Sequence, residues 1–341
     1  MNKKASTKTC GFIYFFIHLF IEVACFYQLY FRFNVGGLFW IYAILFDAIA
    51  FLPQCLFGAL FDKFKNVPFG VIGLIIMALS FINLGNVPSL LLLSLGNAIV
   101  HVDGAKHTLT NANGKIFYNA LFVSGGALGV IAGKLLAKTG LTFIPLILLF
   151  ISLILSYYVY KKHTLLEDEY IPFVPVKTFN GTFLVTVVVM FAVAVRTYLG
   201  YAIPISWNNS DLHAVLLFTA LCLGKLLGGI LADKFGYKIT VFLSLIISIP
   251  FILVGDKIAV LSLIGIMLIN LSMPITVGII CSAFPKNKAF AFGITTVGMF
   301  IGIIPVFFVS LDFYASIILV VVLSLIAYFC ITLLLKGVKN D

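Results

Sequence analysis

The chain has 341 residues, of which 62% are hydrophobic and 10% are charged, with a formal net charge of +10. Soluble domains carry about 25% charged residues, so this composition excludes a soluble globule. The apolar runs are long and continuous, unlike the alternating segments of about 10 residues that build a membrane barrel. We therefore expect an all-α polytopic protein in the lipid bilayer.

Twelve apolar stretches are long enough to be membrane spans. The first follows a basic start and lacks a small-residue cleavage site before Arg32, which favours an uncleaved span over a signal peptide. The fourth is interrupted by Asn97, His101 and Asp103, yet a helix there keeps the loops on alternating sides. The spans are predicted at about 11–31, 37–61, 67–84, 88–107, 115–137, 141–160, 179–201, 212–232, 239–255, 258–283, 289–310 and 313–335.

The positive charges orient these spans. Most of the 22 lysine and arginine residues fall in loops on one side when the N-terminus is placed in the cytoplasm. We therefore expect a multi-pass protein of the cytoplasmic membrane with both termini inside. The lysines sit at the ends of apolar runs and form no basic stripe, so nucleic acid is not an expected partner.

The longest polar connection divides the spans six and six. It carries the acidic run Glu167 to Glu169 and is interpreted as a solvated linker. The predicted organisation is an N-terminal six-helix bundle over 1–160, a cytoplasmic linker over 161–178 and a C-terminal six-helix bundle over 179–341.

Two similar segments close the second span of each half. GALFDKFKN begins at Gly58 and GILADKFGYK begins at Gly229, and aligning Asp62 with Asp233 offsets the copies by about half the chain. A repeat at half-length predicts two bundles related by pseudo-symmetry, an arrangement associated with alternating access.

These segments resemble the loop signature of the major facilitator superfamily of transporters. The first copy departs from the usual pattern at Lys65 and Asn66. The resemblance implies that each aspartate meets the positive end of a helix from the other half, here the spans that begin near 289 and 115, and closes the inner side. The residues that match this gating motif are Gly58, Asp62, Lys63, Gly229, Asp233, Lys234, Gly236 and Lys238.

Further segments are similar to a small branch that contains fosmidomycin-resistance-like exporters. They are GNAIVHVDGAKHTL in span four, SGGALGVIAGK in span five, NLSMPIT in span ten and FAFG in span eleven. This resemblance implies the fold and says little about the substrate, because superfamily members move many kinds of solute.

Ionisable residues inside spans are costly and are functional hypotheses by default. Glu22 lies roughly 16 Å into span one, near the midplane, at a rise of about 1.5 Å per residue. His18 precedes it by four residues, so the two share one helix face and can share or pass a proton, or form a structural pair. Asp47 reaches similar depth in span two. These three residues are the candidate proton carriers.

The candidate substrate-cavity residues differ in sign between the halves. The first half offers Gln54, Asn97 and His101, and the second offers Arg196, Lys225 and Asn270. Structural alternatives remain for four of them: a helix-end cap for His101, an interfacial position for Arg196, an ion pair with Glu22 or Asp47 for Lys225, and a hydrogen bond between helices for Gln54. Acidic spans that face basic spans predict a cavity for a zwitterion or an organic anion.

Glycines recur every four residues in three spans and predict close helix contacts. They are Gly125, Gly129 and Gly133, then Gly224 and Gly228, then Gly298 and Gly302. Such faces are expected either in static packing or at the surfaces along which the halves move.

The leading hypothesis is a monomeric, proton-coupled secondary transporter that exports a small organic solute. No ATP-binding motif is present, and no cofactor is expected. The six cysteines show no CxxC and the five histidines no HxxxH, so the spacing predicts neither a metal site nor a membrane enzyme. An uncoupled facilitator and a non-transporting membrane sensor on the same fold are the alternatives.

Overall fold

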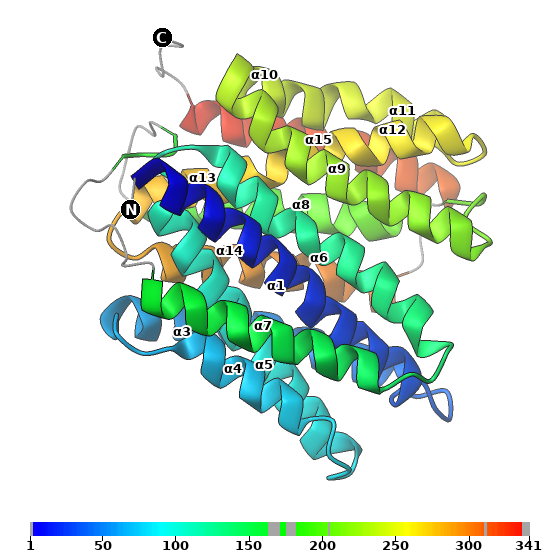
Figure 1. The fold of residues 1–341 in the computed structure, drawn as a ribbon. Coiled ribbons are helices and arrows are strands. Elements are labelled where there is room, and N and C mark those ends of the chain that lie inside the picture. The colour runs from blue at the N-terminus through cyan, green and yellow to red at the C-terminus, as the bar shows by residue number, and fades with distance from the viewer. Residues whose placement is uncertain (1–2, 163–170, 175–181, 204, 310–311, 336–341) are drawn as a thin grey trace.

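A computed structural model describes residues 3–162, 171–174, 182–203, 205–309 and 312–335. The described part is helical throughout (Figure 1). The α-helices are α1 (Lys3–Phe31), α2 (Phe39–Phe51), α3 (Gln54–Lys63), α4 (Phe69–Leu79), α5 (Asn86–Asn111), α6 (Ile116–Ala137), α7 (Phe143–Lys162), α8 (Thr182–Ala202), α9 (Asp211–Phe235), α10 (Tyr237–Phe242), α11 (Ser248–Gly255), α12 (Ala259–Ile269), α13 (Met273–Ala283), α14 (Lys288–Phe308) and α15 (Phe313–Leu334).

Eleven helical segments in the described part are long and apolar enough to cross a membrane. Three of them join consecutive elements: α2 with α3, α10 with α11 through the π-helical turn Leu243–Ile247, and α12 with α13 through the 3-10 turn Asn270–Ser272. The span predicted over 88–107, which polar residues interrupt, is the continuous helix α5.

The span predicted over 67–84 is shorter than expected. The helix α4 ends at Leu79, where the Ser80 hydroxyl donates to the carbonyl of Met77. The chain then turns through Gly85, whose φ of 89° favours glycine over residues with a side chain. The apolar residues after Leu79 therefore belong to a turn, and α4 is a short apolar helix.

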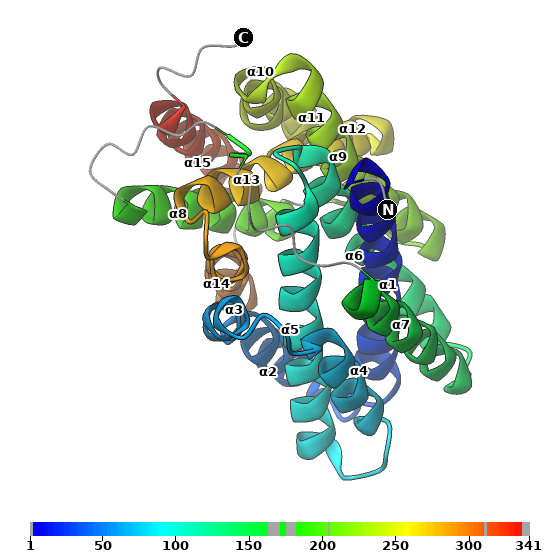
Figure 2. The same ribbon diagram turned by 60° about the vertical axis from the view of Figure 1, so that its left-hand side comes forward.

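The helices before residue 162 and those after residue 182 gather on opposite sides of the molecule (Figure 2). They meet where α6 packs on α9 and where α14 packs on α3. Most of the predicted linker, residues 163–170 and 175–178, lies outside the described residues.

The three glycine stripes pack within these groups. A Cβ atom on Gly125 or Gly129 would collide with backbone carbonyls of α1. The stripe on α9 packs in the same way on Met267 and Leu271, and Gly302 on α14 packs on α8. The stripes therefore serve static helix packing, and the faces where the two groups meet are built by other residues.

Candidate functional site

A cavity of about 290 Å³ lies between the two groups of helices. Its walls carry charges of opposite sign on opposite sides. Glu22 on α1 and Asp47 on α2 belong to the first group, and Arg196 on α8 and Lys225 on α9 belong to the second. Aromatic and aliphatic side chains from both groups fill the wall between them, among them Phe26, Phe46, Phe51, Phe218, Phe292, Met273 and Met299.

Most of the residues selected from the sequence meet at this cavity. His18, Glu22, Asp47, Asn97, His101, Arg196, Lys225 and Asn270 all line it. Gln54 does not, because its side chain is fully buried and its amide donates to the Ala50 carbonyl of the preceding turn at 2.7 Å. Gln54 is therefore not among the lining residues of this cavity, and its hydrogen bond stays within its own helical segment.

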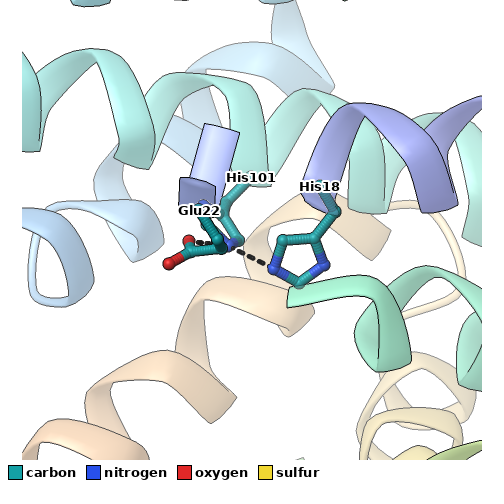
Figure 3. Close-up of side chains that lie close together, drawn as sticks. All are labelled: His18, Glu22 and His101. Carbon is teal, nitrogen blue, oxygen red and sulfur yellow. Dashed lines mark hydrogen bonds and ion pairs between the residues drawn. The ribbon is translucent and has the colours of Figure 1, made fainter. Parts of the chain in front are cut away.

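Two buried histidines from different helices meet at the cavity wall (Figure 3). The Nε2 atoms of His18 on α1 and His101 on α5 are 2.8 Å apart. His101 Nε2 also lies 3.4 Å from Oε1 of Glu22. In the described structure, His101 stands between His18 and Glu22, so these two connect through α5 and not directly along α1 as their spacing indicates.

Backbone carbonyls hold the other nitrogen of each ring. His18 Nδ1 lies 2.7 Å from the carbonyl of Phe122, and His101 Nδ1 lies 3.0 Å from the carbonyl of Asn97. A carbonyl can only accept, so each Nδ1 carries the donated proton. The Asn97 amide donates to Glu22 Oε1 at 3.0 Å and thereby fixes the carboxylate.

The basic wall is not neutralised by the acidic wall. Among the residues that the structure describes, neither Arg196 nor Lys225 forms an ion pair within 4.0 Å, so the expected pairing of Lys225 with Glu22 or Asp47 is not made. Arg196 is only 7% exposed, and its Nε has no hydrogen-bond partner in this part of the chain. Within the described residues, both cations thus line the cavity without an ion pair, although Glu22 and Asp47 lie on the opposite wall.

Sequence reasoning missed several lining residues. Thr197, Tyr201 and Thr296 add hydroxyl groups to the walls of the cavity. Thr197 and Tyr201 follow Arg196 on the same helix, so the position of Arg196 was the one available signal. Nothing in the spacing distinguishes Thr296 from the other hydroxyl residues in the spans.

The two aspartates of the repeated motif lie away from the cavity and join the groups of helices. Asp62, near the end of α3, accepts from the backbone N–H groups of Ala289 at 3.2 Å and Phe290 at 2.9 Å in the first turn of α14. Asp233, near the end of α9, accepts from Ile116 at 2.9 Å and Phe117 at 3.0 Å in the first turn of α6. The helix starts are those that the sequence analysis assigned, and their free N–H groups and positive dipole ends suit a carboxylate.

The glycines of the motif allow these contacts. A Cβ atom on Gly58 would collide with the backbone of Ala289, and one on Gly229 would lie 2.9 Å from Cα of Phe117. Gly236 ends α9 with a φ of 89°. Lys65 stands at the equivalent place in the first copy.

The lysines of the motif lie beside the aspartates. Lys63 and Lys234 rest over the rings of the phenylalanines that follow them, with Nζ to centroid distances of 5.4 Å and 5.1 Å. Lys238 is the second residue of α10.

No family model matches the sequence, and no curated protein matches it. Solved structures do match. The E. coli fucose:proton symporter FucP, as a variant, superposes with a TM-score of 0.66 at 13% identity over 100% of both chains. FucP in the outward conformation gives a TM-score of 0.63 at 13% identity over 98% of this chain and 99% of its own.

The human organic anion transporter MFSD10 (TETRAN) superposes with a TM-score of 0.69 at 11% identity, over 97% of this chain and 99% of its own. These proteins are transporters and not enzymes. The eleven apolar helices support a multi-pass membrane protein. The chain therefore has the fold of the major facilitator superfamily transporters.

Proposed function

We propose that this protein is a secondary transporter that moves a small organic solute across a membrane by alternating access. The observation that carries the proposal is the cavity between the two groups of helices, with Glu22 and Asp47 on one wall and Arg196 and Lys225 on the other. The similarity in fold to a fucose:proton symporter and to an organic anion transporter supports it.

The solute is a small organic anion or zwitterion. Arg196 and Lys225 have no anionic partner within the described residues, and a buried cation is costly until it is paired. A carboxylate or similar group between them would supply that pairing. The aromatic wall residues would contact the apolar body of the solute, as in most small-molecule sites.

Alternating access follows from two six-helix bundles, 1–160 and 179–341, that rock about the cavity. In this arrangement the short apolar helix α4 is the third of twelve spans, and both termini lie in the cytoplasm. Asp62 and Asp233 then close the inner side, since each joins one bundle to a helix start of the other. The protein acts as a monomer in the cytoplasmic membrane.

Transport is coupled to protons, with His18, Glu22 and Asp47 as the carriers. All three face the cavity, where a bound solute can change their surroundings. The motifs shared with fosmidomycin-resistance-like exporters favour export. An uncoupled facilitator would keep the cavity and the aspartate contacts without this coupling.

The test is a screen in vesicles that contain the purified protein and an internal pH dye. Solutes of each charge class are added, and solute-dependent proton movement is recorded. We expect anions or zwitterions to give a signal that is lost in Asp47→Asn and in Glu22→Gln at equal protein levels. A signal that survives both substitutions would refute the carriers, and binding without any flux would favour the sensor.

A second pair of substitutions tests whether the solute carries a negative charge. Lys225→Gln removes one cavity cation, and Lys138→Gln removes a cation that pairs with Asp211 at the exposed surface at 2.6 Å. We expect the first to abolish solute binding, measured by thermal shift, and the second to leave it unchanged. Equal effects would contradict an anion site at Lys225.

A further inference from the structure

The two histidines at the cavity wall present their free nitrogens to the same point. Each Nδ1 donates to a backbone carbonyl, so each Nε2 is left with a lone pair in the neutral ring. The two Nε2 atoms are 2.8 Å apart. Two lone pairs at this distance repel each other unless a proton or a metal ion lies between them. The geometry therefore calls for positive charge at this point.

The third group at this point is the carboxylate of Glu22. One ligand atom from each of His18, Glu22 and His101 lies within 4.8 Å of the others, and all three side chains are buried. Two imidazole nitrogens and one carboxylate oxygen form a known donor set for zinc, in which an open fourth position takes water or substrate. The three residues line the cavity, so a fourth position can face it.

The surroundings of the three side chains are those of a metal site. Histidines that bind metals through one ring nitrogen almost always donate the other to a carbonyl or carboxylate. Both histidines do so here, and the Asn97 amide holds Glu22 in the same manner. Each ligand therefore has a partner that fixes its direction before a metal arrives.

There is room for an ion once the rings part slightly. A tetrahedral ion with bonds of about 2.0–2.1 Å holds two nitrogens about 3.3 Å apart, so the Nε2 atoms must separate by about half an ångström. Gly126 on α6 faces His18 Nε2, and a Cβ atom there would collide with it. The absence of a side chain at Gly126 keeps this nitrogen accessible.

We propose that His18, His101 and Glu22 form a binding site for a transition-metal dication of the zinc class, open to the central cavity. Imidazole suits Zn²⁺, Co²⁺ and Ni²⁺ better than Mg²⁺ or Ca²⁺, which prefer oxygen ligands. The site is formed by α1 and α5 and does not depend on the proposed transport function.

The experiment titrates tag-free, detergent-purified protein with Co²⁺ and records the visible absorption of tetrahedral cobalt. We expect one equivalent to bind, the absorption to disappear when Zn²⁺ is added, and Mg²⁺ to have no effect. His18→Gln and His101→Gln are expected to abolish the signal. Asn97→Ala should weaken cobalt binding by about 10–100-fold, because removing a group that hydrogen-bonds a metal ligand typically lowers metal affinity by this factor.

Two controls separate this site from other causes. His213→Gln removes a histidine at the start of α9, outside the cavity, and Asp47→Asn removes a cavity carboxylate outside the cluster. Both are expected to retain full cobalt binding. Gly126→Ala is expected to abolish it although every ligand is kept, and thermal unfolding and size-exclusion profiles establish that each variant is folded.

The proposal is overturned by any of three results. They are the absence of a tetrahedral cobalt signal from folded protein, a signal that survives His101→Gln, and a signal that is lost in His213→Gln. None of them measures solute flux, so the cavity is tested separately as a solute site. While His18 and Glu22 hold a metal they cannot carry a proton, and that role then falls to Asp47.

Discussion

The aspartate contacts with helix starts lead to a quantitative prediction for Asp62→Asn. The Asp62 carboxylate accepts from the N–H groups of Ala289 and Phe290, which have no acceptor within α14 because they belong to its first turn. Asparagine carries no charge and keeps one acceptor oxygen, so the remaining bond is weakened and at least one charge-assisted bond is lost. Such a bond contributes about 1.5–3 kcal/mol, which corresponds to roughly a 10- to 150-fold change in an equilibrium constant.

Hydrogen–deuterium exchange measures this change at the same amides. We expect Asp62→Asn to speed exchange at Ala289 and Phe290 by about 10- to 150-fold. If the two groups of helices separate as rigid bodies, exchange at Ile116 and Phe117 also accelerates, because Asp233 joins the same two groups.

The matched control is Asp312→Asn. Asp312 accepts from the N–H of Ala315 at 2.8 Å and caps its own helix, α15, without joining the two groups. We expect this substitution to leave exchange at residues 289–290 and 116–117 unchanged. Faster exchange at 289–290 alone in Asp62→Asn would refute concerted closure, and no change at either place would refute a stabilising role for the aspartate.

Three further substitutions test the packing around these elements. Gly58→Ala should also speed exchange at Ala289, because its methyl group collides with that backbone. Gly236→Ala should lower the unfolding free energy by about 1–3 kcal/mol, since its φ of 89° is strained for a side chain. Arg32→Ala should lower it by about 1–2 kcal/mol, measured by thermal unfolding, because the guanidinium donates four bonds to the 80–85 turn. Unchanged exchange in Gly58→Ala, or unchanged stability in the other two variants, would contradict these contacts.

The apolar runs predicted most of the fold because a membrane span must be apolar along its whole length. The same rule fails for α4, where the turn at Ser80 interrupts a run that hydrophobicity alone continues. The half-length repeat placed Asp62 and Asp233 at helix ends, and the resemblance to the major facilitator superfamily implied the helix starts that they meet, in agreement with the helix dipole.

The side chains that line the cavity could be predicted only in part from the sequence. Glu22 and Asp47, chosen for their depth along a helix, both line the cavity, but Gln54 does not, because the direction of a side chain depends on packing. The meeting of His18 with His101 joins helices that are distant in sequence. A motif search along one segment cannot detect such a pair. The glycine spacing likewise predicted close contacts without identifying the partner helices.

Solute counterflow tests the central claim most directly, because exchange across a sealed bilayer requires a site that opens alternately to each side. Vesicles that contain the protein are loaded with an unlabelled solute chosen by the binding screen, and the same solute is added outside in labelled form. The account predicts transient accumulation of label in the vesicles, with loss of accumulation in Lys225→Gln. Binding of the solute without counterflow would contradict transport and assign the cavity to a sensor.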